Sequence, residues 1–480
     1  MTSDNLTLHT DKYQINMMYA HWAQGTHNDR AVFEVYFRKL PFGNGFAVCA
    51  GLERVVEYIQ QLRFGEREIS YLAGQEEAYE AGFLEELKQL RFTGDLFAVP
   101  EGTVVFASEP LIRVEARIME AQLIETAILN VVNYQTLVAT KAARIKQIAS
   151  ADGLLEFGTR RAQETEAAVW GARAAYLAGF DATSNLRAGM LFGIPAKGTH
   201  AHSWVQMFDS EEDAFEAYAA ALPEQVTLLV DTYDTLKSGL PNAIRTAHSL
   251  KARGKRMKAI RLDSGDLAYL SKEARRILDE AGLPGVKIVA SNDIDEHIMA
   301  ELKAQGAKID IWGIGTRLIT AADNPALGGV YKLVAREKDG TYIPVIKISG
   351  NPEKVTTPGI KDAYRILNKA TGKAEADYIM LTGETDIEEG KPLKLFDPVH
   401  PYLHKVVKDY VALPLLRPVF RGGRLVCTLP DLEQIRTRHR SQLELFWPEY
   451  LRKLNPEKYP VDLSPAVWEL KKKLIEKHRT

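Results

Sequence analysis

The sequence has few cysteines, no excess charge and no long apolar segment. Only Cys49 and Cys427 occur among 480 residues, so neither a disulfide framework nor a cysteine zinc site is expected, and a reducing compartment fits best. The 61 Lys and Arg residues nearly balance the 63 Asp and Glu residues, which disfavours nucleic acid or an anionic membrane as a partner. No uncharged run reaches the ~20 residues that span a bilayer, and no secretory signal pattern opens the chain. We expect a cytoplasmic protein that holds any anionic ligand locally.

The chain is long enough for more than one hydrophobic core. Residues 1–120 mix short strands and helices and predict an α+β domain. Residues 121–345 predict an α/β barrel that carries the active site, and residues 346–480 predict strands and a charged helical tail that pack with the first domain. A long helical pattern covers residues 116–149, with a break expected near Asn133.

A regular alternation of strands and helices occupies the middle of the chain. The expected strands are 154–159, 182–185, 194–199, 226–232, 258–264, 287–292 and 309–316. Amphipathic helices such as 211–222 and 265–282 lie between them. This order predicts a parallel sheet, and the number of units favours a closed, TIM-like α/β barrel over an open sheet. A doubly wound open sheet is the alternative, although no G-x-G-x-x-G motif follows any of these strands.

Small, hydroxylated and charged residues gather where these strands end, which is the edge of an α/β barrel that carries the chemistry. Gly-Thr pairs at the expected helix starts offer backbone N–H groups to phosphate. Arg160, Arg161 and Arg261 can bind phosphate or carboxylate oxygens. The candidate Mg²⁺ ligands, by residue type, are Asp231, Asp263 and Asp266. The pattern predicts a site for a polyanion with magnesium.

The segment "KGTHAHSW" places His200 and His202 one residue apart at a strand end. Such a pair can bind a metal, carry a phosphoryl group, polarise a substrate or simply pack. A catalytic metal centre would need further ligands at later strand ends, and none of the other histidines, of 11 in all, lies there. A structural role suits His200, and His202 is the better functional candidate.

A set of motifs together resembles the nicotinate phosphoribosyltransferase family. The motifs are "TDKYQINMMYA" (10–20), "NYQTLVATKAARI" (133–145), "EFGTRRAQ" (156–163), "GTHAHSWV" (198–205), "LLVDTYDTLKSG" (228–239), "IRLDSGDLAYLSK" (260–272), "IVASNDIDE" (288–296), "GIGTRLIT" (313–320) and "PALGGVYKLVA" (325–335). They follow the family order from about residue 10 to about residue 360. Each motif alone is weak evidence, whereas the set is specific.

The resemblance implies a type II phosphoribosyltransferase with an irregular α/β barrel and a second domain built from both chain ends. It implies a homodimer with shared active sites. The implied reaction joins nicotinate to 5-phosphoribosyl 1-diphosphate, giving nicotinate mononucleotide and diphosphate for NAD biosynthesis by salvage. The resemblance also implies Mg²⁺ as cofactor and ATP as co-substrate, with ATP hydrolysis coupled through a phosphohistidine, which places the enzyme among the ligases.

The family's functional residues fall on positions of this chain. His202 matches the phosphoacceptor, and Tyr13 matches an aromatic residue that stacks on the pyridine ring in the partner subunit's site. The other matches are Thr199 and Arg261 for nicotinate, Arg160 for diphosphate, Gly315 and Thr316 for the phosphoribosyl phosphate, Ser184 and Asn292 for substrate, and Asp263 and Asp266 for the metal.

Three alternatives remain open at this point. A nicotinamide or quinolinate transferase has the same fold, but the turn at residues 183–185 lacks the acid that nicotinamide enzymes carry, which favours nicotinate. A metal-dependent amidohydrolase would use His200 and His202 as ligands. A barrel that binds without catalysis is the third alternative, and the charged strand ends disfavour it.

Overall fold

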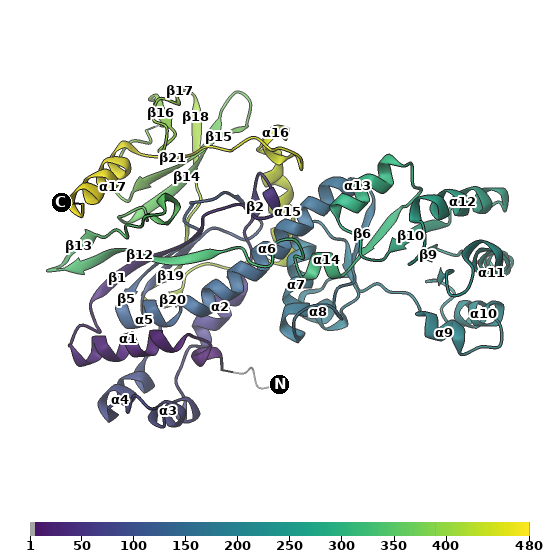
Figure 1. Ribbon diagram of the computed structural model, residues 1–480, viewed down its shortest axis with the longest axis horizontal. Helices are drawn as coiled ribbons and strands as arrows, with labels where there is room; N and C mark the ends of the chain where they lie inside the picture. The colour runs from purple at the N-terminus through teal and green to yellow at the C-terminus, as the bar shows by residue number, and fades with distance from the viewer. Residues whose placement is uncertain (1–4, 389, 480) are drawn as a thin grey trace. The chain divides into compact units, whose positions relative to one another are not determined.

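The computed structural model describes residues 5–388 and 390–479. The chain divides into two compact units (Figure 1). We call residues 1–137 with 326–480 the terminal unit, and residues 138–325 the central unit. Within the described residues, every helix is too short or too polar to cross a membrane.

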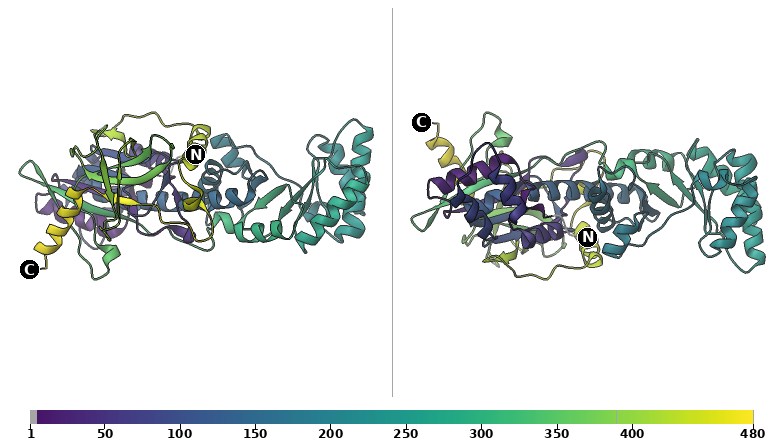
Figure 2. Two further views of the ribbon diagram at one scale, coloured as in Figure 1. Left: turned by 90° about the horizontal axis from the view of Figure 1, so that it is seen from above. Right: turned by 90° about the horizontal axis from the view of Figure 1, so that it is seen from below.

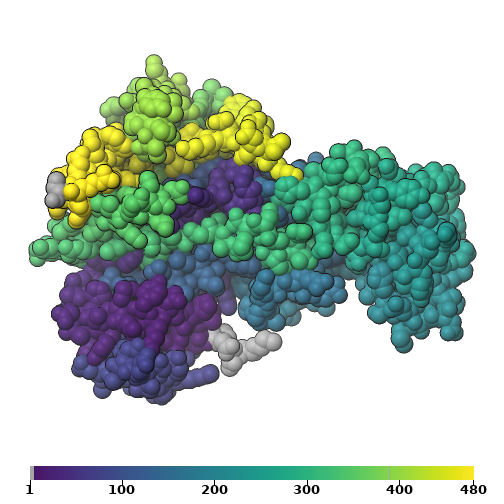
Figure 3. Space-filling view, viewed as in Figure 1, coloured from purple at the N-terminus to yellow at the C-terminus, as the bar shows by residue number. Residues whose placement is uncertain are grey.

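A seven-stranded sheet joins both ends of the chain in the terminal unit, in the order β13-β12-β1-β5-β3-β19-β20. Residues of β1 pair antiparallel with β12, as Phe33 does with Leu333. Figure 3 shows purple amino-terminal residues beside green and yellow carboxyl-terminal residues of this unit. The strands are β1 (Arg30–Phe37), β3 (Asp95–Ala98), β5 (Ile112–Arg117), β12 (Gly329–Lys338), β13 (Thr341–Pro344), β19 (Arg417–Arg421) and β20 (Arg424–Leu425). Its helices α1 (Lys12–Ala23), α2 (Leu52–Gln61), α3 (Glu66–Ala73), α4 (Ala81–Gln89) and α5 (Ile118–Leu123) belong to the amino-terminal part.

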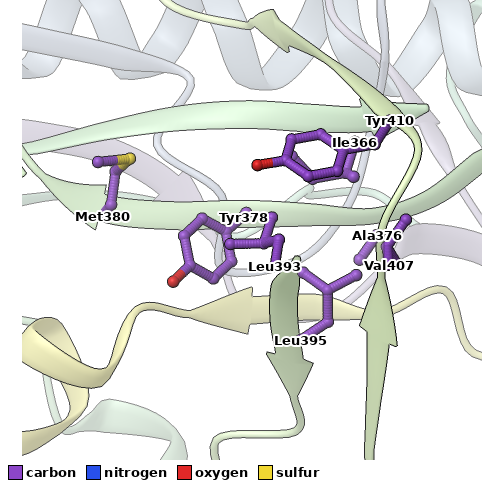
Figure 4. Close-up of a cluster of buried hydrophobic side chains, with 8 residues drawn as sticks. All are labelled: Ile366, Ala376, Tyr378, Met380, Leu393, Leu395, Val407 and Tyr410. Atoms are coloured by element: carbon purple, nitrogen blue, oxygen red, sulfur yellow. The ribbon is translucent and has the colours of Figure 1, made fainter. Parts of the chain in front are cut away.

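A second sheet of the terminal unit has the order β18-β14-β15-β21. Its strands are β14 (Lys361–Asn368), β15 (Ala374–Leu381), β18 (Tyr410–Pro414) and β21 (Val461–Leu463), and the pairs β16 (Leu393–Phe396) with β17 (His404–Val407) and β2 (Ala47–Val48) with β4 (Val104–Val105) are separate. Apolar side chains from β14 to β18 form a buried cluster that includes Tyr378, Met380 and Leu395 (Figure 4). The charged tail ends in α15 (Leu432–Glu444), α16 (Pro448–Leu451) and α17 (Pro465–Lys477). These strands and helices agree with the pattern expected beyond residue 345.

The central unit is built on a six-stranded parallel sheet in the order β7-β6-β11-β10-β9-β8. The strands are β6 (Gly153–Glu156), β7 (Ala182–Thr183), β8 (Thr227–Leu229), β9 (Ala259–Leu262), β10 (Lys287–Ser291) and β11 (Ile311–Ile314). Figures 1 and 2 show its helices gathered around the strands. They are α7 (Thr165–Leu177), α8 (Leu186–Phe192), α9 (His202–Gln206), α10 (Glu211–Ala221), α11 (Leu240–Ala252), α12 (Leu267–Glu280), α13 (Glu296–Ala304) and α14 (Thr316–Ile319). The expected parallel α/β arrangement is confirmed.

The segment expected as a strand at 194–199 does not form one. Only a single bridge, Thr183 to Ala196, joins it to β7, and the sheet has β7 and β8 as its edges. Pro195 has no N–H group to extend a ladder. The sheet is therefore curled and open at these edges rather than a closed ring of strands.

The long helical pattern is interrupted at Ile124 and not near Asn133. Helix α6 (Glu125–Ala149) continues through Asn133, whose side-chain oxygen accepts from the Gly329 backbone N–H at 3.0 Å. Asn133 therefore pairs with a distant segment instead of competing with its own helix. No glycine or proline marks Ile124, so the sequence carries no signal for the true break.

Candidate active site

Arg261 lies at the centre of the predicted residues on the carboxyl ends of the parallel strands. Its Nε donates to Ser291 Oγ at 2.8 Å, and its terminal nitrogens donate to Thr199 Oγ1 at 3.0 Å and Asp263 Oδ1 at 2.9 Å. Its guanidinium carbon lies 5.5 Å from the ring centre of Phe157, and its side chain is 17% exposed. An arginine has five N–H groups, so these bonds leave one on each terminal nitrogen. A rigid cation with two available donors can bind a carboxylate.

Two aspartates connect the ends of β8, β9 and β10. Asp263 accepts from Ser291 Oγ as well as from Arg261. Its backbone N–H donates to Asp231 Oδ2 at 2.9 Å, and Ser264 Oγ donates to the same oxygen at 2.6 Å. Asp231 Oδ1 is buried and has no hydrogen-bond partner among the described residues. A buried carboxylate oxygen without a partner is costly, so this atom is the one best placed to accept from a ligand.

His200 and His202 face different groups. His202 Nδ1 lies 3.1 Å from Thr232 Oγ1 and the ring is half-buried. His200 is buried, with Nε2 3.2 Å from the Leu229 backbone nitrogen and Nδ1 3.3 Å from the Ala201 oxygen. Burial lowers the pKa of His200, the Ala201 carbonyl opposes this shift, and the charges of Arg261 and His202 add to it. These surroundings favour the neutral form of His200.

The loop after β6 is fixed by a buried acid that the sequence analysis did not single out. Glu156 accepts from Thr183 Oγ1 at 2.6 Å and from the Gly158 backbone N–H, and burial raises its pKa. A side chain at Gly158 would meet Ile319 at 2.6 Å. These contacts fix the backbone conformation of the loop, and Arg160 is exposed on it. The acid and Phe157 directly precede Gly158 at the strand end, a pattern that could have drawn attention to both.

Ser184 follows β7 next to this loop. Its backbone N–H donates to the backbone oxygen of Glu156 at 2.9 Å, and its side chain is exposed. Asn185 caps α8 through its side chain, which accepts from the Ala188 N–H at 3.0 Å. Ser184 therefore presents an exposed hydroxyl beside the strand ends, and the turn holds no acid.

The Gly-Thr pairs do not all begin helices as expected. Gly158 and Thr159 lie in a turn, in which Arg161 N–H donates to the Gly158 oxygen at 2.8 Å, and α7 begins only at Thr165. Thr316 does begin a helix, but α14 is only four residues long. The expected helix dipoles therefore contribute little at these turns.

Two further predicted residues lie at strand ends with special backbone geometry. Asn292 follows β10 with a φ of 101°, in the left-handed region that side chains rarely adopt. A side chain at Gly315 would lie 2.9 Å from the Phe157 oxygen, so only glycine fits there. Strained and close-packed backbone is concentrated at functional sites, and both positions lie on the edge that carries Arg261.

The predicted magnesium ligands differ in their surroundings. Asp263 is paired with Arg261, and Asp266 caps α12 by accepting from the Tyr269 N–H at 3.0 Å. Mg²⁺ bound to a diphosphate keeps several waters and needs only one or two protein carboxylates. Asp231 Oδ1, which has no partner among the described residues, can supply one such carboxylate. The site therefore does not require a full set of protein ligands around the ion.

A separate group of close metal-ligating side chains comprises two residues at the start of α13 and one that follows α14. Glu296, His297 and Asp323 are the metal-ligand cluster found among the described residues. Glu296 is fully buried and contacts Lys141 at 2.8 Å and Arg144 at 2.8 Å. These cations already neutralise the acid, so the group is an internal ion network.

The terminal unit carries Tyr13 and a cluster of cations. Tyr13 lies on α1, its side chain is 50% exposed, and burial raises its pKa. Burial also lowers the pKa of Lys332, where Glu125 opposes the shift and the charges of Lys347 and Arg38 add to it. Like charges held together favour an anionic ligand. Arg38 lies about 300 positions before Lys332 and Lys347 in the chain, so no sequence motif brings the three cations together.

The fold and the site define an α/β enzyme whose polar and charged side chains gather at the carboxyl ends of parallel strands. Family profiles extend this assignment over nearly the whole chain. The nicotinate phosphoribosyltransferase N-terminal domain matches residues 8–133, the nicotinate phosphoribosyltransferase family matches residues 153–373, and the C-terminal domain matches residues 360–471.

Individual relatives agree with the profiles. The chain is 53% identical over 474 residues to nicotinate phosphoribosyltransferase of Bacillus subtilis, covering 98% of this chain and 96% of that protein. It is 34% identical to the human protein of that name, covering 96% and 95%. A crystal structure of human nicotinic acid phosphoribosyltransferase matches with a TM-score of 0.86 and 33% identity, covering 97% of this chain and 99% of that chain. The chain belongs to the nicotinate phosphoribosyltransferase family of enzymes.

Proposed function

We propose that this enzyme transfers the 5-phosphoribosyl group from 5-phosphoribosyl 1-diphosphate to nicotinate, giving nicotinate mononucleotide and diphosphate for NAD biosynthesis by salvage. The observation that carries the proposal is Arg261, held on three sides with one N–H left on each terminal nitrogen. These donors suit the nicotinate carboxylate, and the ring of Phe157 lies against the same guanidinium. The names of the relatives support the same substrate.

The chemistry needs alignment and charge more than a protein nucleophile. As diphosphate leaves, C1 of the ribose becomes positive, and the pyridine nitrogen attacks it directly. Arg261 orients the ring through its carboxylate. We assign the carboxylates of Asp231 and Asp263 to the ribosyl side and Arg160, Gly315 and Thr316 to the phosphates, with Ser184 and Asn292 lining the same edge.

We propose that Mg²⁺ enters bound to the diphosphate and that the protein does not hold the ion in a separate site of its own. The buried Oδ1 of Asp231 has no partner among the described residues, and Asp263 and Asp266 lie on the next strand end. When bound, the ion would neutralise the leaving group. The residues themselves orient the phosphates and exclude water.

We propose that ATP hydrolysis is coupled to the transfer through His202. With its proton on Nδ1 donating to Thr232 Oγ1, His202 has a free electron pair on Nε2. Attack of Nε2 on the γ-phosphorus forms a P–N bond and breaks the P–O bond to ADP, and water later releases phosphate. Nothing in the transfer to nicotinate itself requires this bond.

A labelling experiment tests His202. With Mg-ATP, the enzyme should form an acid-labile, base-stable phosphoprotein, and His202→Asn should abolish the label. The matched control is His248→Asn, because His248 is an exposed histidine on α11 of the same unit. Label that persists in His202→Asn would contradict the assignment. Synthesis without ATP should survive in this variant at a reduced rate.

A homodimer with shared active sites is also proposed. Tyr13 and Met17 are exposed on α1, and Leu186, Met190 and Leu191 are exposed on α8, so both units have apolar surface for a second copy. If Tyr13 completes the partner's site, mixing inactive Tyr13→Ala and Arg261→Ala subunits should restore part of the activity. No recovery after verified subunit exchange would refute a shared site.

A substrate comparison tests the reaction as a whole. We expect turnover with nicotinate and the phosphoribosyl donor, stimulation by ATP, and little turnover with nicotinamide. Equal use of nicotinamide would support the amide-specific alternative instead. We place the enzyme in the cytoplasm, where the free thiols of Cys49 and Cys427 would remain reduced.

A further inference from the structure

The open side of the central sheet is spanned by the segment that leads to His200. At one edge, Thr183 N–H donates to the Pro195 oxygen at 3.0 Å, and Lys197 N–H donates to the Thr183 oxygen at 2.9 Å. These bonds join the segment to β7. Backbone pairing then stops, and the segment reaches the other edge of the sheet through a side chain.

That side chain is the imidazole of His200. Its Nε2 lies 3.2 Å from the backbone nitrogen of Leu229 in β8. The N–H of the next residue, Val230, donates to the Arg261 oxygen of β9 at 3.2 Å. Alternate residues of a parallel strand bond to opposite sides, so the Leu229 N–H faces the outer edge, where a further strand would supply a carbonyl oxygen. The imidazole nitrogen takes the place of that carbonyl.

The other contacts of the ring determine its protonation. Nδ1 faces the Ala201 oxygen at 3.3 Å and must donate there, so Nε2 carries the electron pair that accepts from Leu229. The ring packs against Phe215 and Tyr218 of α10, with centroid distances of 5.9 and 5.0 Å. A protonated imidazole would lose the acceptor.

We propose that His200 is a positioning residue whose neutral imidazole closes the central sheet between the 194–200 segment and β8. Thr199 and His202 lie one and two residues away, and they contact Arg261 and Thr232 respectively. Fixing His200 therefore fixes both residues against their partners. This role is distinct from phosphoryl transfer and rests on the proposed roles of Arg261 and His202 only for its effect on activity.

Amide and aromatic substitutions separate this role from simple packing. In His200→Gln, the amide group reaches the place of Nε2 and can accept from Leu229. In His200→Asn, the amide reaches only the place of Nδ1. His200→Phe keeps a ring among Phe215 and Tyr218 but has no acceptor. The Gln and Asn pair differs by one methylene and remains informative if the Phe variant fails to fold.

The hydrogen-exchange rate of the Leu229 amide measures its hydrogen bond to His200 directly and does not depend on enzyme activity. Because a buried N–H without an acceptor is costly, the Leu229 amide should exchange about tenfold faster or more in the Asn and Phe variants. It should remain near the wild-type rate in His200→Gln. The amide of Val289 in β10, which pairs on both sides, is the internal control. Unchanged exchange at Leu229 in both the Asn and Phe variants would overturn the proposal.

Kinetics then test positioning. We expect kcat/KM for nicotinate to fall about tenfold in His200→Asn and to recover in His200→Gln, with both variants folded by circular dichroism. A Gln variant as impaired as the Asn variant would overturn the positioning role. Faster exchange at Leu229 with unchanged kinetics would also overturn the positioning role. His200 would then only join the segment to β8. If wild-type enzyme lacked the proposed activity while exchange changed as expected, the proposed function alone would fail.

Discussion

Replacing Arg261 is the sharpest perturbation of the proposed nicotinate site. In Arg261→Ala the substrate carboxylate loses its cation in a pocket where the guanidinium is 17% exposed. Truncating one partner of a buried, hydrogen-bonded charge pair costs roughly 2–5 kcal/mol. That corresponds to a loss of about 30-fold to several thousand-fold in kcat/KM for nicotinate.

The loss must be separated from a general collapse of the site. Arg261 also holds Ser291, Thr199 and Asp263, so its removal disturbs binding of the phosphoribosyl donor too. Nicotinamide has the same ring without the carboxylate. The ratio of kcat/KM for nicotinate to that for nicotinamide cancels the shared disturbance and leaves the carboxylate contact.

Steady-state assays with both substrates at a saturating donor concentration measure this ratio. We expect the ratio to fall by at least tenfold in Arg261→Ala. Arg261→Lys should give an intermediate value, because an ammonium keeps the charge and loses the planar fork. Equal losses with nicotinate and nicotinamide would refute a carboxylate contact and leave Arg261 as a structural partner of Asp263.

Two further predictions concern other parts of the chain. Thr232→Val should slow phosphorylation of His202 by about tenfold, since it removes the Nδ1 partner at 3.1 Å, whereas Thr232→Ser should retain the wild-type labelling rate; equal rates in all three proteins would contradict this role. His439 is buried, and burial lowers its pKa from 6.5 to about 4, so its neutral form contributes stability that is present above pH 6.5 and is lost as the pH falls towards 4. The difference in unfolding free energy between wild type and His439→Asn, from urea titrations, should therefore change by about 3 kcal/mol between pH 7 and 4, and a pH-independent difference would show that His439 is already charged or exposed.

Strands of the central sheet were predictable because each is a short apolar run between helical patterns. Strands β9 and β10 lie within the expected ranges 258–264 and 287–292. The segment at 194–199 was also expected as a strand, but it contains a proline, and its backbone pairs with the β7 edge through a single bridge from Thr183 to Ala196. Composition measures the tendency to be buried, and it does not measure whether an edge is available for pairing.

Contacts within the site were not predictable in the same way. The sequence indicated Arg261 and Asp263 as strand-end residues, but not that they form a salt bridge at 2.9 Å. Such pairing depends on which side chains of three adjacent strand ends point the same way. The ring of Phe157 beneath Arg261 was missed for another reason, because an apolar residue at a strand end is read as core.

The two histidines show how the fold decides between alternatives that spacing leaves open. Residues i and i+2 of an extended segment share a face, and that geometry would let His200 and His202 chelate one metal. Helix α9 begins at His202 and ends the extended conformation there. Both ring nitrogens of His200 already face protein groups, the Leu229 N–H and the Ala201 oxygen. A metal would have to displace the Leu229 amide and leave it buried without an acceptor, so the arrangement disfavours the amidohydrolase alternative.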